Sequence, residues 1–513
     1  MRTAPPASDA LDLNGFCAIA LDGAVFAIPP AELERAAACF HFLEGVARER
    51  VIYGINTGFG PLAQRHVAPA DAETLQYNLV RSHAAGAGRP LPASVVRAMM
   101  LTRVVTFLKG RSGVSTGVIE RLCLFLRESI APEVPEHGGV GASGDLTQQA
   151  HLGLALIGEG FCLHNGARRP VADVLRELDL APVPLKLRDG LAILNGTACM
   201  TGLGLITVKH AGQLMDHAIA MGAVLTEIAG TYDDHLSAEL NAAKPHPGQN
   251  EVARRLRVQL TGSQCIRKRE EHSQAPDERH VEGAYTDLVQ PLYSIRCLPQ
   301  LLGPIHDTIR QAESVLLAEL HGVDDNPVID PEQGTVLHGG NFHGDQVALE
   351  LDKLRLALVK LGLLVERQLN YLMNDALNRR FPPFLSTGKA GLVHGLQGMQ
   401  YTATSSAAEN QALATSLYVH SIPNNNDNQD VVSMGTNAAR ATAQVVQNTA
   451  RIMAVQAIAL AQAVEIGELR DQLSPSGRAF VDAVREVVPP VGTQALNGIT
   501  DRVKDTLFIP PLA

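Results

Sequence analysis

The chain has 513 residues, of which 46% are hydrophobic, 19% are charged and only 4% are aromatic, and its formal net charge is −10. This apolar content excludes a mainly disordered chain, and the scarcity of aromatic side chains favours a core of closely packed helices rich in aliphatic residues and alanine. The acidic balance argues against nucleic acid as a partner, because a phosphate backbone requires a basic surface.

Targeting and metal-binding signals are not evident. The N-terminal sequence lacks a basic start followed by an apolar run, so we expect no signal peptide. The apolar stretch 453–466 is interrupted by polar residues and is too short to span a bilayer, so we expect no membrane segment. Seven scattered cysteines without a Cys-x-x-Cys pair are typical of reduced thiols in a cytoplasmic protein. The histidines form no His-Glu-x-x-His motif, so we expect no metal site.

The first half of the chain predicts short elements separated by glycine-rich loops. Apolar runs predict short strands at 17–21 and 25–28, and a helix is predicted at 31–48. Residues 53–61 and 132–144 are rich in glycine or proline and are predicted to be loops. Further helices are predicted at 70–85, 92–109 and 114–130.

The second half predicts long helices. Apolar residues recur at three- and four-residue spacing from 347 to 372, and further leucines occupy other faces. Residues 436–466 predict an alanine-rich helix of about 45 Å, at ~1.5 Å per residue. Helices that are apolar on several sides lie inside a bundle or at a subunit interface. We therefore predict a mainly α, oligomeric protein with an elongated central helical bundle and a smaller N-terminal α+β region, divided into domains at 1–200 and 201–513.

The most unusual segment is His137-Gly-Gly-Val-Gly-Ala-Ser-Gly-Asp-Leu146. By itself it is a small-residue loop ending in a helix cap at Ser143 or Asp145. A nucleophile elbow is not supported, because Asp145 stands where the second glycine belongs. A third interpretation is covalent: in a tightly bent loop the Gly144 nitrogen can attack the carbonyl carbon of Ala142, since small residues permit this approach. Loss of water closes the ring, and loss of the Ser143 hydroxyl leaves an electrophilic methylidene.

This segment resembles the signature of the aromatic amino acid ammonia-lyases and related aminomutases, in which Ala-Ser-Gly cyclises to a methylidene-imidazolone (MIO) group. The resemblance continues in order through YGINTGFGPL at 53–62, NLVRSHAAGAG at 78–88, LAILNGT at 191–197, KPHPGQ at 244–249, YSIRCLPQ at 293–300, DDNPV at 324–328, HGGNFHGD at 338–345 and NNNDNQDVVSMGT at 424–436. It implies a fumarase/aspartase-like fold, MIO formed from Ala142, Ser143 and Gly144 with no metal or external cofactor, and a homotetramer whose active sites combine motifs from different subunits.

The resemblance also implies roles for single residues. Elimination of ammonia must remove a weakly acidic β-proton and activate a poor leaving group; MIO would take up the amine, and Tyr53 resembles the catalytic base. A phenol serves as a base only where donors or positive charge stabilise the phenolate. Arg296 resembles the clamp on the substrate carboxylate, and Tyr293 a residue that stabilises the intermediate. The remaining implied site residues are Gly60, His83, Asn195, Asn326, Phe342 and Gln429, which bind substrate, and Asp145, which assists cyclisation.

Two segments depart from the family pattern. The run Asp-Leu-x-Pro-Leu is replaced by Asp145-Leu-Thr-Gln-Gln149, and Gln-Asp-x-Tyr is replaced by Gln290-Pro-Leu-Tyr293. The segment 424–430 resembles a calcium loop in composition only, because Gln429 stands where such a loop requires glycine.

The substrate prediction depends on His83 and Gln429. His83 can form a hydrogen bond with an imidazole or a phenol, but it would be left unpaired against phenylalanine at a cost of roughly 1–3 kcal/mol. Histidine lyases carry a glutamate where this chain has Gln429, whereas tyrosine and phenylalanine lyases carry glutamine. The strings RSHAAG, GGVGASGDL, HGGNFHGD and HSIPNNNDNQD are most similar to bacterial tyrosine ammonia-lyases.

We therefore predict an enzyme that eliminates ammonia from L-tyrosine to give trans-p-coumarate. A histidine ammonia-lyase that forms urocanate is the first alternative, and a tyrosine 2,3-aminomutase that adds the ammonia back is the second. A third alternative, a helical scaffold without activity, is disfavoured by the intact Ala142-Ser143-Gly144, Tyr53 and Arg296.

Overall fold

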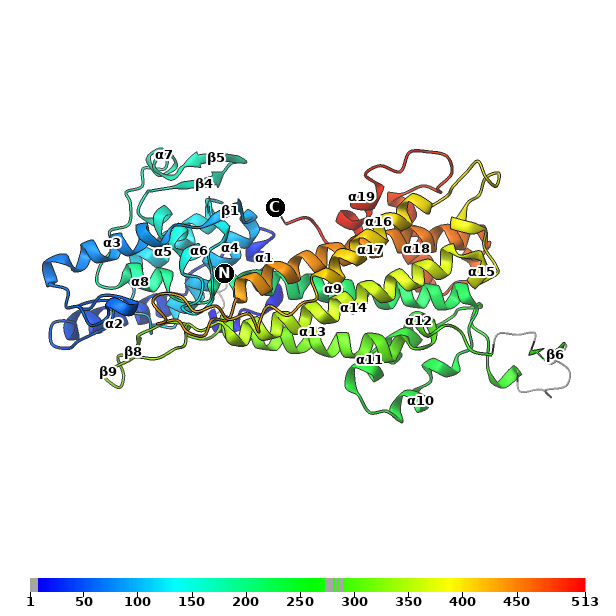
Figure 1. The fold of residues 1–513 in the computed structure, drawn as a ribbon, viewed down its shortest axis with the longest axis horizontal. Helices are drawn as coiled ribbons and strands as arrows, with labels where there is room; N and C mark the ends of the chain where they lie inside the picture. The colour runs from blue at the N-terminus through cyan, green and yellow to red at the C-terminus, as the bar shows by residue number, and fades with distance from the viewer. Residues whose placement is uncertain (1–7, 273–279, 282–283, 286–288, 513) are drawn as a thin grey trace, which may run out of the picture.

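The protein is elongated and mainly helical in the computed structural model, which describes residues 8–272, 280–281, 284–285 and 289–512. Short N-terminal helices gather at one end, and long helices run along the molecule (Figure 1). The long helices are α9 Ala198–Ala229, α13 Leu298–Leu320, α14 Asp345–Met373 and α17 Gly435–Ile466. This arrangement confirms the predicted elongated helical bundle.

The N-terminal region is built from short helices, namely α1 Leu13–Ala20, α2 Pro30–Val46, α3 Ala72–His83, α4 Ala93–Leu108, α5 Thr116–Arg127, α6 Leu146–Leu156, α7 Val171–Glu177 and α8 Asp189–Leu194. The other α-helices are α10 Ala238–Ala242, α11 Pro247–Gln259, α12 Tyr293–Arg296, α15 Asp375–Asn378, α16 Gln397–Ala412, α18 Pro475–Val487 and α19 Ile499–Val503. The division of the chain at residue 200 stays a prediction.

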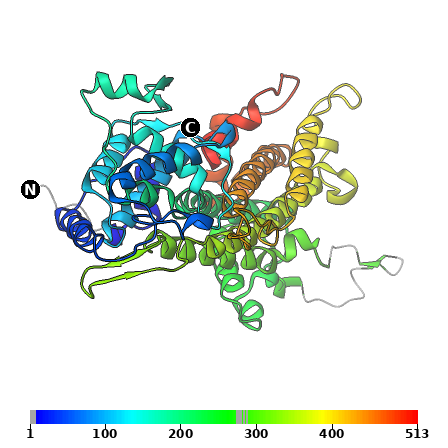
Figure 2. The ribbon, with the colours of Figure 1, turned by 60° about the vertical axis from the view of Figure 1, so that its left-hand side comes forward.

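The strands are short and pair antiparallel. They are β1 Ala87–Pro90 with β3 Pro135–His137; β4 Phe161–His164 between β2 Ala131–Pro132 and β5 Ala167–Pro170; β6 His280–Val281 with β7 Ala284–Tyr285; and β8 Val328–Asp330 with β9 Thr335–Leu337. The β8–β9 hairpin extends beneath the N-terminal helices (Figures 1 and 2), where Ile329 packs against Leu43 of α2.

The helices predicted at 31–48, 70–85, 92–109, 114–130 and 436–466 are confirmed as α2, α3, α4, α5 and α17. The strands predicted at 17–21 and 25–28 are wrong. Residues 17–20 belong to α1, because the Asp12 side chain accepts the Gly15 amide hydrogen at 2.7 Å and caps the helix. Residues 25–28 form no strand, and Val25 is 73% exposed.

The bundle core depends on small side chains along α17. Ala450, Ala454, Ala457 and Ala461 are fully buried, and their spacing places them on one helix face. Alanine at these positions lets neighbouring helices approach closely. By length and composition α17 could cross a membrane, but 83% of its most apolar window is buried inside the protein, as in the core helix of a globular bundle.

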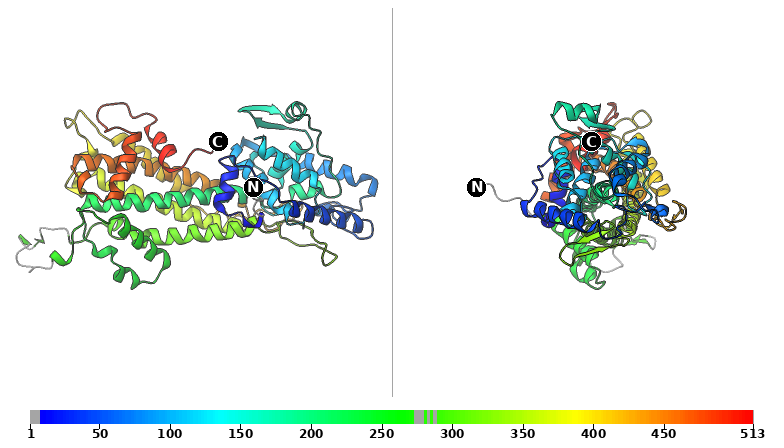
Figure 3. Two further views of the ribbon diagram at one scale, coloured as in Figure 1. Left: turned by 180° about the vertical axis from the view of Figure 1, so that it is seen from behind. Right: turned by 90° about the vertical axis from the view of Figure 1, so that its left-hand side faces the viewer.

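Three long helices begin at the same place in the molecule. The N-termini of α9, α14 and α17 all lie beside the loop at 140–145, which contacts Gly196, Gly344 and Met434. The opposite end of the rod carries α10, α11 and α12, as the view from behind also shows (Figure 3). The fold therefore places the unusual small-residue loop at the junction between the N-terminal region and the bundle.

Candidate active site

A cavity of about 540 Å³ lies above this loop and brings together several predicted site residues. Those that line it are Tyr53, Gly60, His83, Ser143, Asn195 and Gln429. Its apolar wall includes Leu75, Leu79, Leu146 and Leu191. The cavity thus combines polar groups for chemistry with an apolar surface that an aromatic ring could contact.

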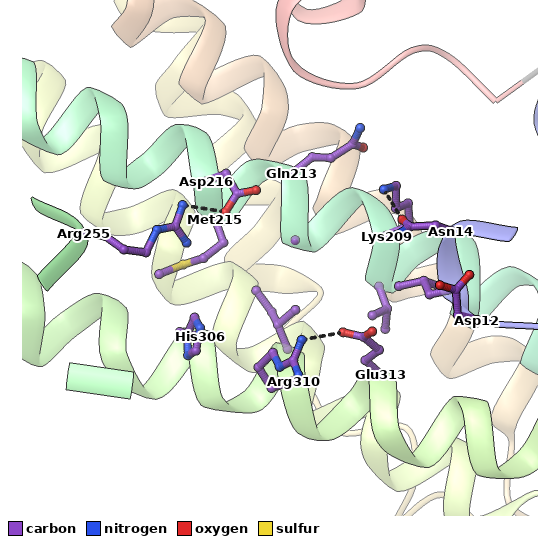
Figure 4. A pocket seen from close by; sticks show the side chains of 14 residues that line it. Asp12, Asn14, Lys209, Gln213, Met215, Asp216, Arg255, His306, Arg310 and Glu313 are labelled. Carbon is purple, nitrogen blue, oxygen red and sulfur yellow. Dashed lines mark hydrogen bonds and ion pairs between the residues drawn. The ribbon is translucent and has the colours of Figure 1, made fainter. Parts of the chain in front are cut away.

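Two other pockets among the described residues are not lined by any predicted site residue. The pocket in Figure 4, of about 360 Å³, lies on the side of the bundle, and its arginines point toward acidic neighbours. Arg255 pairs with Asp216 at 2.8 Å, and Arg310 pairs with Glu313 at 3.4 Å. A larger cavity of about 1100 Å³ lies among residues 226–271. Its size alone gives it no chemical role.

Hydrogen bonds fix the backbone around Ala142-Ser143-Gly144. They join Met434 N to Val140 O at 2.9 Å, Gly344 N to Gly141 O at 3.0 Å, Gly196 N to Ser143 O at 3.3 Å and Asp145 N to Gly196 O at 2.8 Å. The N-termini of α14 and α17 are bonded to Val140 and Gly141, before the tripeptide. The turn before α9 is bonded to Ser143 and Asp145, at its other end. The loop is therefore clamped from two sides.

The two groups that would react in cyclisation are free. Among the hydrogen bonds recorded for described residues, none uses the Gly144 amide hydrogen or the Ala142 carbonyl oxygen. Gly144 has φ 67°, a conformation that favours glycine, and a β-carbon there would overlap the Gly196 carbonyl oxygen. The tripeptide thus fits the requirements for MIO formation: a bent glycine, a free nucleophile and fixed flanks.

Asp145 anchors the start of α9. Its carboxylate is fully buried and accepts hydrogen bonds from the amides of Cys199 and Met200, both at 2.9 Å, and from the Thr436 hydroxyl. Burial raises the pKa of Asp145 to about 6, against the effect of these donors. Its side chain therefore contacts the helix starts, and its predicted role in cyclisation stays a prediction.

The converging helix starts make the floor of the cavity electropositive. The N-terminus of an α-helix carries partial positive charge from its unpaired amide groups. Because α9, α14 and α17 all begin at the loop, negative charge near Ser143 is favoured. This environment suits a phenolate or a carboxylate.

Tyr53 is held in its glycine-rich loop. Its hydroxyl oxygen accepts the Gly60 amide hydrogen at 2.9 Å, and its ring meets Phe59 edge-to-face at 6.1 Å between centroids. A backbone donor on the phenol oxygen stabilises the phenolate, which is what a tyrosine base requires. Tyr53 and Gly60, predicted separately as a catalytic and a substrate-binding residue, are therefore joined by a hydrogen bond on the cavity wall.

His83 ends α3 and faces the cavity. Its Nδ1 lies 3.0 Å from the Leu79 carbonyl oxygen, which can only accept, and 3.1 Å from the Ser82 hydroxyl oxygen, which can donate or accept. In the tautomer that donates from Nδ1 to Leu79, the ring presents Nε2 as an acceptor on its other side. His83 is therefore ready to bind a group that donates a hydrogen bond.

Gln429 contacts the reactive loop directly. Its side-chain amide donates to the Ser143 hydroxyl oxygen at 3.1 Å. Three neighbours, Asn425, Asn426 and Asn428, also line the cavity but were not singled out from the sequence. The signal was the run of polar residues in NNNDNQD, which gave no basis for choosing among the asparagines.

Asn195 and Asn326 lie side by side. The Asn195 side-chain amide donates to the Asn326 backbone oxygen at 3.3 Å, and the Asn326 side-chain oxygen accepts the Gly339 amide hydrogen at 2.9 Å. Only Asn195 lines the cavity. Asn326 instead supports the loop that carries Phe342, which is half-buried and does not line the cavity in this chain.

Tyr293 and Arg296 lie at the other end of the bundle. Their helix α12 is attached to Gln368 of α14, which donates to the Ser294 carbonyl oxygen at 2.8 Å. At ~1.5 Å per residue, Gln368 is about 35 Å along α14 from the loop at Ser143. Within one chain these two residues therefore do not join the cavity. Tyr293 is 71% exposed, and the Arg296 guanidinium carbon lies 4.8 Å from its ring centroid.

Known proteins match this chain along nearly its whole length. Residues 11–486 match the model of a family described as aromatic amino acid lyase. A tyrosine ammonia-lyase of Cereibacter sphaeroides is 42% identical, covering 94% of this chain and 93% of the relative. A histidine ammonia-lyase of Geobacillus thermodenitrificans is also 42% identical, covering 87% and 85%. An MIO-dependent tyrosine 2,3-aminomutase of Streptomyces globisporus is 38% identical, covering 92% and 89%.

A solved structure of a tyrosine aminomutase from Streptomyces globisporus superposes with a TM-score of 0.94 at 36% identity, covering 98% of this chain and 96% of the other. The likeness confirms the predicted fumarase/aspartase-like helical fold. Relatives with three different reactions match at similar identity. The match therefore identifies the family, and the substrate has to be inferred from the residues of the site. This chain belongs to the aromatic amino acid lyase family.

Proposed function

We propose that the protein is an ammonia-lyase that converts L-tyrosine to trans-p-coumarate. The observation that carries this proposal is the position of His83, which lines the same cavity as Ser143 and Tyr53 with its Nδ1 against the Leu79 carbonyl oxygen, so that the tautomer donating to Leu79 offers Nε2 as an acceptor. A tyrosine phenol can donate to this atom, whereas the ring of phenylalanine would leave it unpaired. The amide of Gln429 near Ser143 supports a neutral rather than a cationic ring.

Ala142, Ser143 and Gly144 would supply the prosthetic group. MIO is an electrophile that takes up the substrate amine and makes it a better leaving group. Tyr53 would then remove the β-proton, since Gly60 holds its oxygen and the helix starts of α9, α14 and α17 favour negative charge. His83 would bind the phenol, and the apolar leucines would exclude water from the ring.

The site would be completed by a second copy of this chain. Arg296 suits a substrate carboxylate because its planar fork makes paired hydrogen bonds, yet it lies about 35 Å away along α14. Exposed Leu349 and Leu356 on α14 offer an apolar face to a partner, at 40% and 49% exposure. We therefore propose the family homotetramer, in which one subunit presents Tyr293 and Arg296 to another subunit's cavity.

We also propose a cytoplasmic location. All seven cysteines lie in the described part of the chain and are free thiols, and most are buried. Free thiols are typical of proteins in reducing compartments.

The proposal is tested by incubating the purified protein separately with L-tyrosine, L-histidine and L-phenylalanine and following the absorbance of each unsaturated acid. We expect coumarate to form fastest. Faster urocanate formation would replace tyrosine with histidine as the substrate, and accumulation of a β-amino acid would make the protein an aminomutase.

A variant of the reactive loop tests the proposed chemistry. Ser143→Ala should fold normally and lose nearly all turnover with every substrate, because alanine has no hydroxyl to lose as water. Mass spectrometry of the peptide containing 142–144 should show that the wild type, but not the variant, is lighter by two water molecules. Substantial turnover by Ser143→Ala would contradict the proposed electrophile.

A further inference from the structure

Asp325 is a buried carboxylate behind the wall of the cavity. Its Oδ1 accepts hydrogen bonds from the Arg188 guanidinium at 2.7 Å, from the Asn326 backbone amide at 2.8 Å and from the Asn195 side chain at 3.3 Å. Its Oδ2 lies 3.3 Å from a second Arg188 nitrogen and 3.5 Å from an Arg103 nitrogen. Burial by itself would raise the pKa of Asp325, but the two arginines outweigh it and hold the pKa below its usual range. Asp325 is therefore an ionised group that can only accept hydrogen bonds.

These contacts decide how the side-chain amide of Asn195 is oriented. Its nitrogen has two partners, Asp325 Oδ1 and the Asn326 backbone oxygen, each at 3.3 Å. Both partners only accept, so the amide must turn its nitrogen toward them. Asn195 lines the cavity, and among the described residues no recorded hydrogen bond reaches its Oδ1. The polar atom that Asn195 has left for a ligand is therefore an acceptor.

This acceptor suits the amino group of the proposed substrate. Asn195 directly precedes Gly196, whose amide donates to the Ser143 carbonyl oxygen at 3.3 Å, so Asn195 lies beside the reactive tripeptide. An α-amino group carries N–H donors whether or not it is protonated, and its nitrogen must reach the group formed from Ser143. An oxygen at this place can hold the amine, whereas a rotated Asn195 would oppose it with N–H groups of its own.

We propose that Asp325 is a positioning residue for substrate binding, because it fixes the Asn195 side chain with its oxygen free to accept from the substrate amine. This inference rests on the proposed function. The second partner of Asn195 depends on the same carboxylate: Asp325 bonds the Asn326 amide, and it pairs with Arg188, which donates to the Asn326 backbone oxygen at 2.9 Å. Loss of the Asp325 oxygens would therefore leave the Asn195 amide free to exchange its two ends.

Two substitutions at position 325 separate the acceptor from the negative charge. Asp325→Asn removes the charge but keeps one oxygen for Asn195 and Asn326, since its amide nitrogen can take the place of Oδ2, where the contacts to the arginines are longer. Asp325→Leu removes the charge and both acceptors. In either variant Arg188 keeps the backbone oxygens of Ser112 and Asn326 as partners. Asp325→Asn is therefore the matched control for Asp325→Leu.

The experiment measures ligand binding to the full-length protein carrying Ser143→Ala, so that no ligand is turned over. Isothermal titration calorimetry gives the affinities of L-tyrosine and of 3-(4-hydroxyphenyl)propionate, which differ only in the amino group. Asp325→Leu should weaken tyrosine about tenfold relative to the propionate, which corresponds to the loss of one hydrogen bond to a charged group. Asp325→Asn should keep the ratio of the parent protein.

The same substitutions are then made in the protein that retains Ser143. Asp325→Leu should raise KM for tyrosine, while the peptide containing 142–144 still becomes lighter by two water molecules. Asp325→Asn should restore KM toward the wild-type value. Thermal midpoints are recorded for every variant, because both substitutions remove a buried charge and should lower stability.

A purely structural role for Asp325 predicts a different pattern. The two ligands would weaken together, or Asp325→Asn and Asp325→Leu would behave alike, and either result would overturn the assignment. If Asp325→Leu does not fold, Asp325→Val removes the same acceptors with a smaller side chain, and the same change in the ratio of affinities is expected. Wild-type protein that forms no unsaturated acid from tyrosine, histidine or phenylalanine would instead overturn the proposed function.

Discussion

At the scale of single residues, the direction of one hydrogen bond decides what the cavity can recognise. The imidazole of His83 is polar at both nitrogens, and in the tautomer protonated at Nδ1 the Leu79 carbonyl oxygen accepts a hydrogen bond from that nitrogen. The atom left for the substrate is an acceptor. A phenol is a good donor and the ring of phenylalanine is not, so the proposed contact with His83 would favour tyrosine over phenylalanine without any charged group.

We predict that His83→Leu shifts the preference from tyrosine to phenylalanine. Leucine cannot accept the phenol hydrogen, and it removes the unpaired nitrogen that disfavours phenylalanine. The ratio of kcat/KM values for tyrosine and phenylalanine should fall by about 10- to 100-fold, since an unpaired polar group costs roughly 1–3 kcal/mol. Steady-state kinetics with both substrates measures this ratio, and an unchanged ratio would show that His83 does not contact the ring.

Glu319 is a partly buried acidic residue behind the reactive loop, and its ionisation lowers the stability of the folded protein. Its carboxyl group is half-buried and accepts the Thr197 hydroxyl hydrogen at 2.5 Å. Burial, with repulsion from Asp324 and Asp145, raises its pKa to about 7. A raised pKa favours the protonated form in the folded state, so the stabilisation is present at low pH and is lost as the pH rises through about 7.

We predict that Glu319→Gln removes part of the pH dependence of stability. The wild type should lose about 1 kcal/mol of unfolding free energy between pH 6 and pH 8 that the variant keeps, because glutamine cannot ionise. Denaturant titrations at both pH values measure the difference. Asp189 titrates in both proteins and cancels, whereas the repulsion between Asp145 and Glu319 is present only in the wild type and adds to the difference, so parallel pH profiles would contradict the raised pKa of Glu319.

At the scale of elements, α14 connects the two chemically important ends of the molecule. Its N-terminus contacts the reactive loop, and Gln368 near its C-terminus holds α12 through the Ser294 carbonyl oxygen. Gln368 also accepts a hydrogen bond from Gln456 of α17 at 2.9 Å. The position of Arg296 therefore depends on a buried glutamine pair inside the bundle.

We predict that Gln368→Leu raises KM while leaving dehydration of Ser143 complete. The change leaves the Ser294 oxygen and the Gln456 amide unpaired, which should cost roughly 1–3 kcal/mol of stability and let α12 shift. Kinetics and peptide mass measure the two effects. Gln462→Leu is the control: this buried glutamine bonds Val491 at 3.0 Å, away from α12, so it should lower stability with an unchanged KM.

At the scale of the whole molecule, one chain does not complete the site. Tyr53, His83, Ser143 and Gln429 share a cavity, whereas Arg296 lies at the far end of the same rod. A rod with reactive groups at both ends can complete its sites by antiparallel association. The separation of these residues along one chain supports the proposed tetramer.

We predict that mixed oligomers of two inactive variants recover activity. Ser143→Ala and Arg296→Ala subunits should each be inactive alone, but after co-expression some sites would combine an intact loop with an intact arginine. Ammonia release per subunit measures the recovery. A mixture of Ser143→Ala with Tyr53→Phe should stay inactive, because both residues come from the same chain in the cavity. Equal behaviour of the two mixtures would contradict the shared site.

Much of the fold could be predicted from the sequence where a local signal was strong. Apolar spacing identified α14, alanine-rich composition identified α17, and small residues identified the reactive loop. The apolar run at 17–21 was wrongly predicted to be a strand, because its strand-like composition does not show that the Asp12 cap starts helix α1 before it. Asn425 and Asn428 were missed since a loop of similar polar residues carries no periodicity that shows which side chains face a cavity.

The sequence by itself determined the chemistry that is available, because the order of side chains fixes which backbone can cyclise and which groups can act as acid, base or clamp. Only the tertiary structure decided where these groups stand. It showed that the Gly144 amide has no hydrogen-bond partner among the described residues, that His83 lies in the cavity wall with Nδ1 against Leu79, and that Arg296 is remote from Ser143 in its own chain. Hydrogen-bond partners and distances between remote segments arise from tertiary packing, and this packing cannot be derived from any short run of residues.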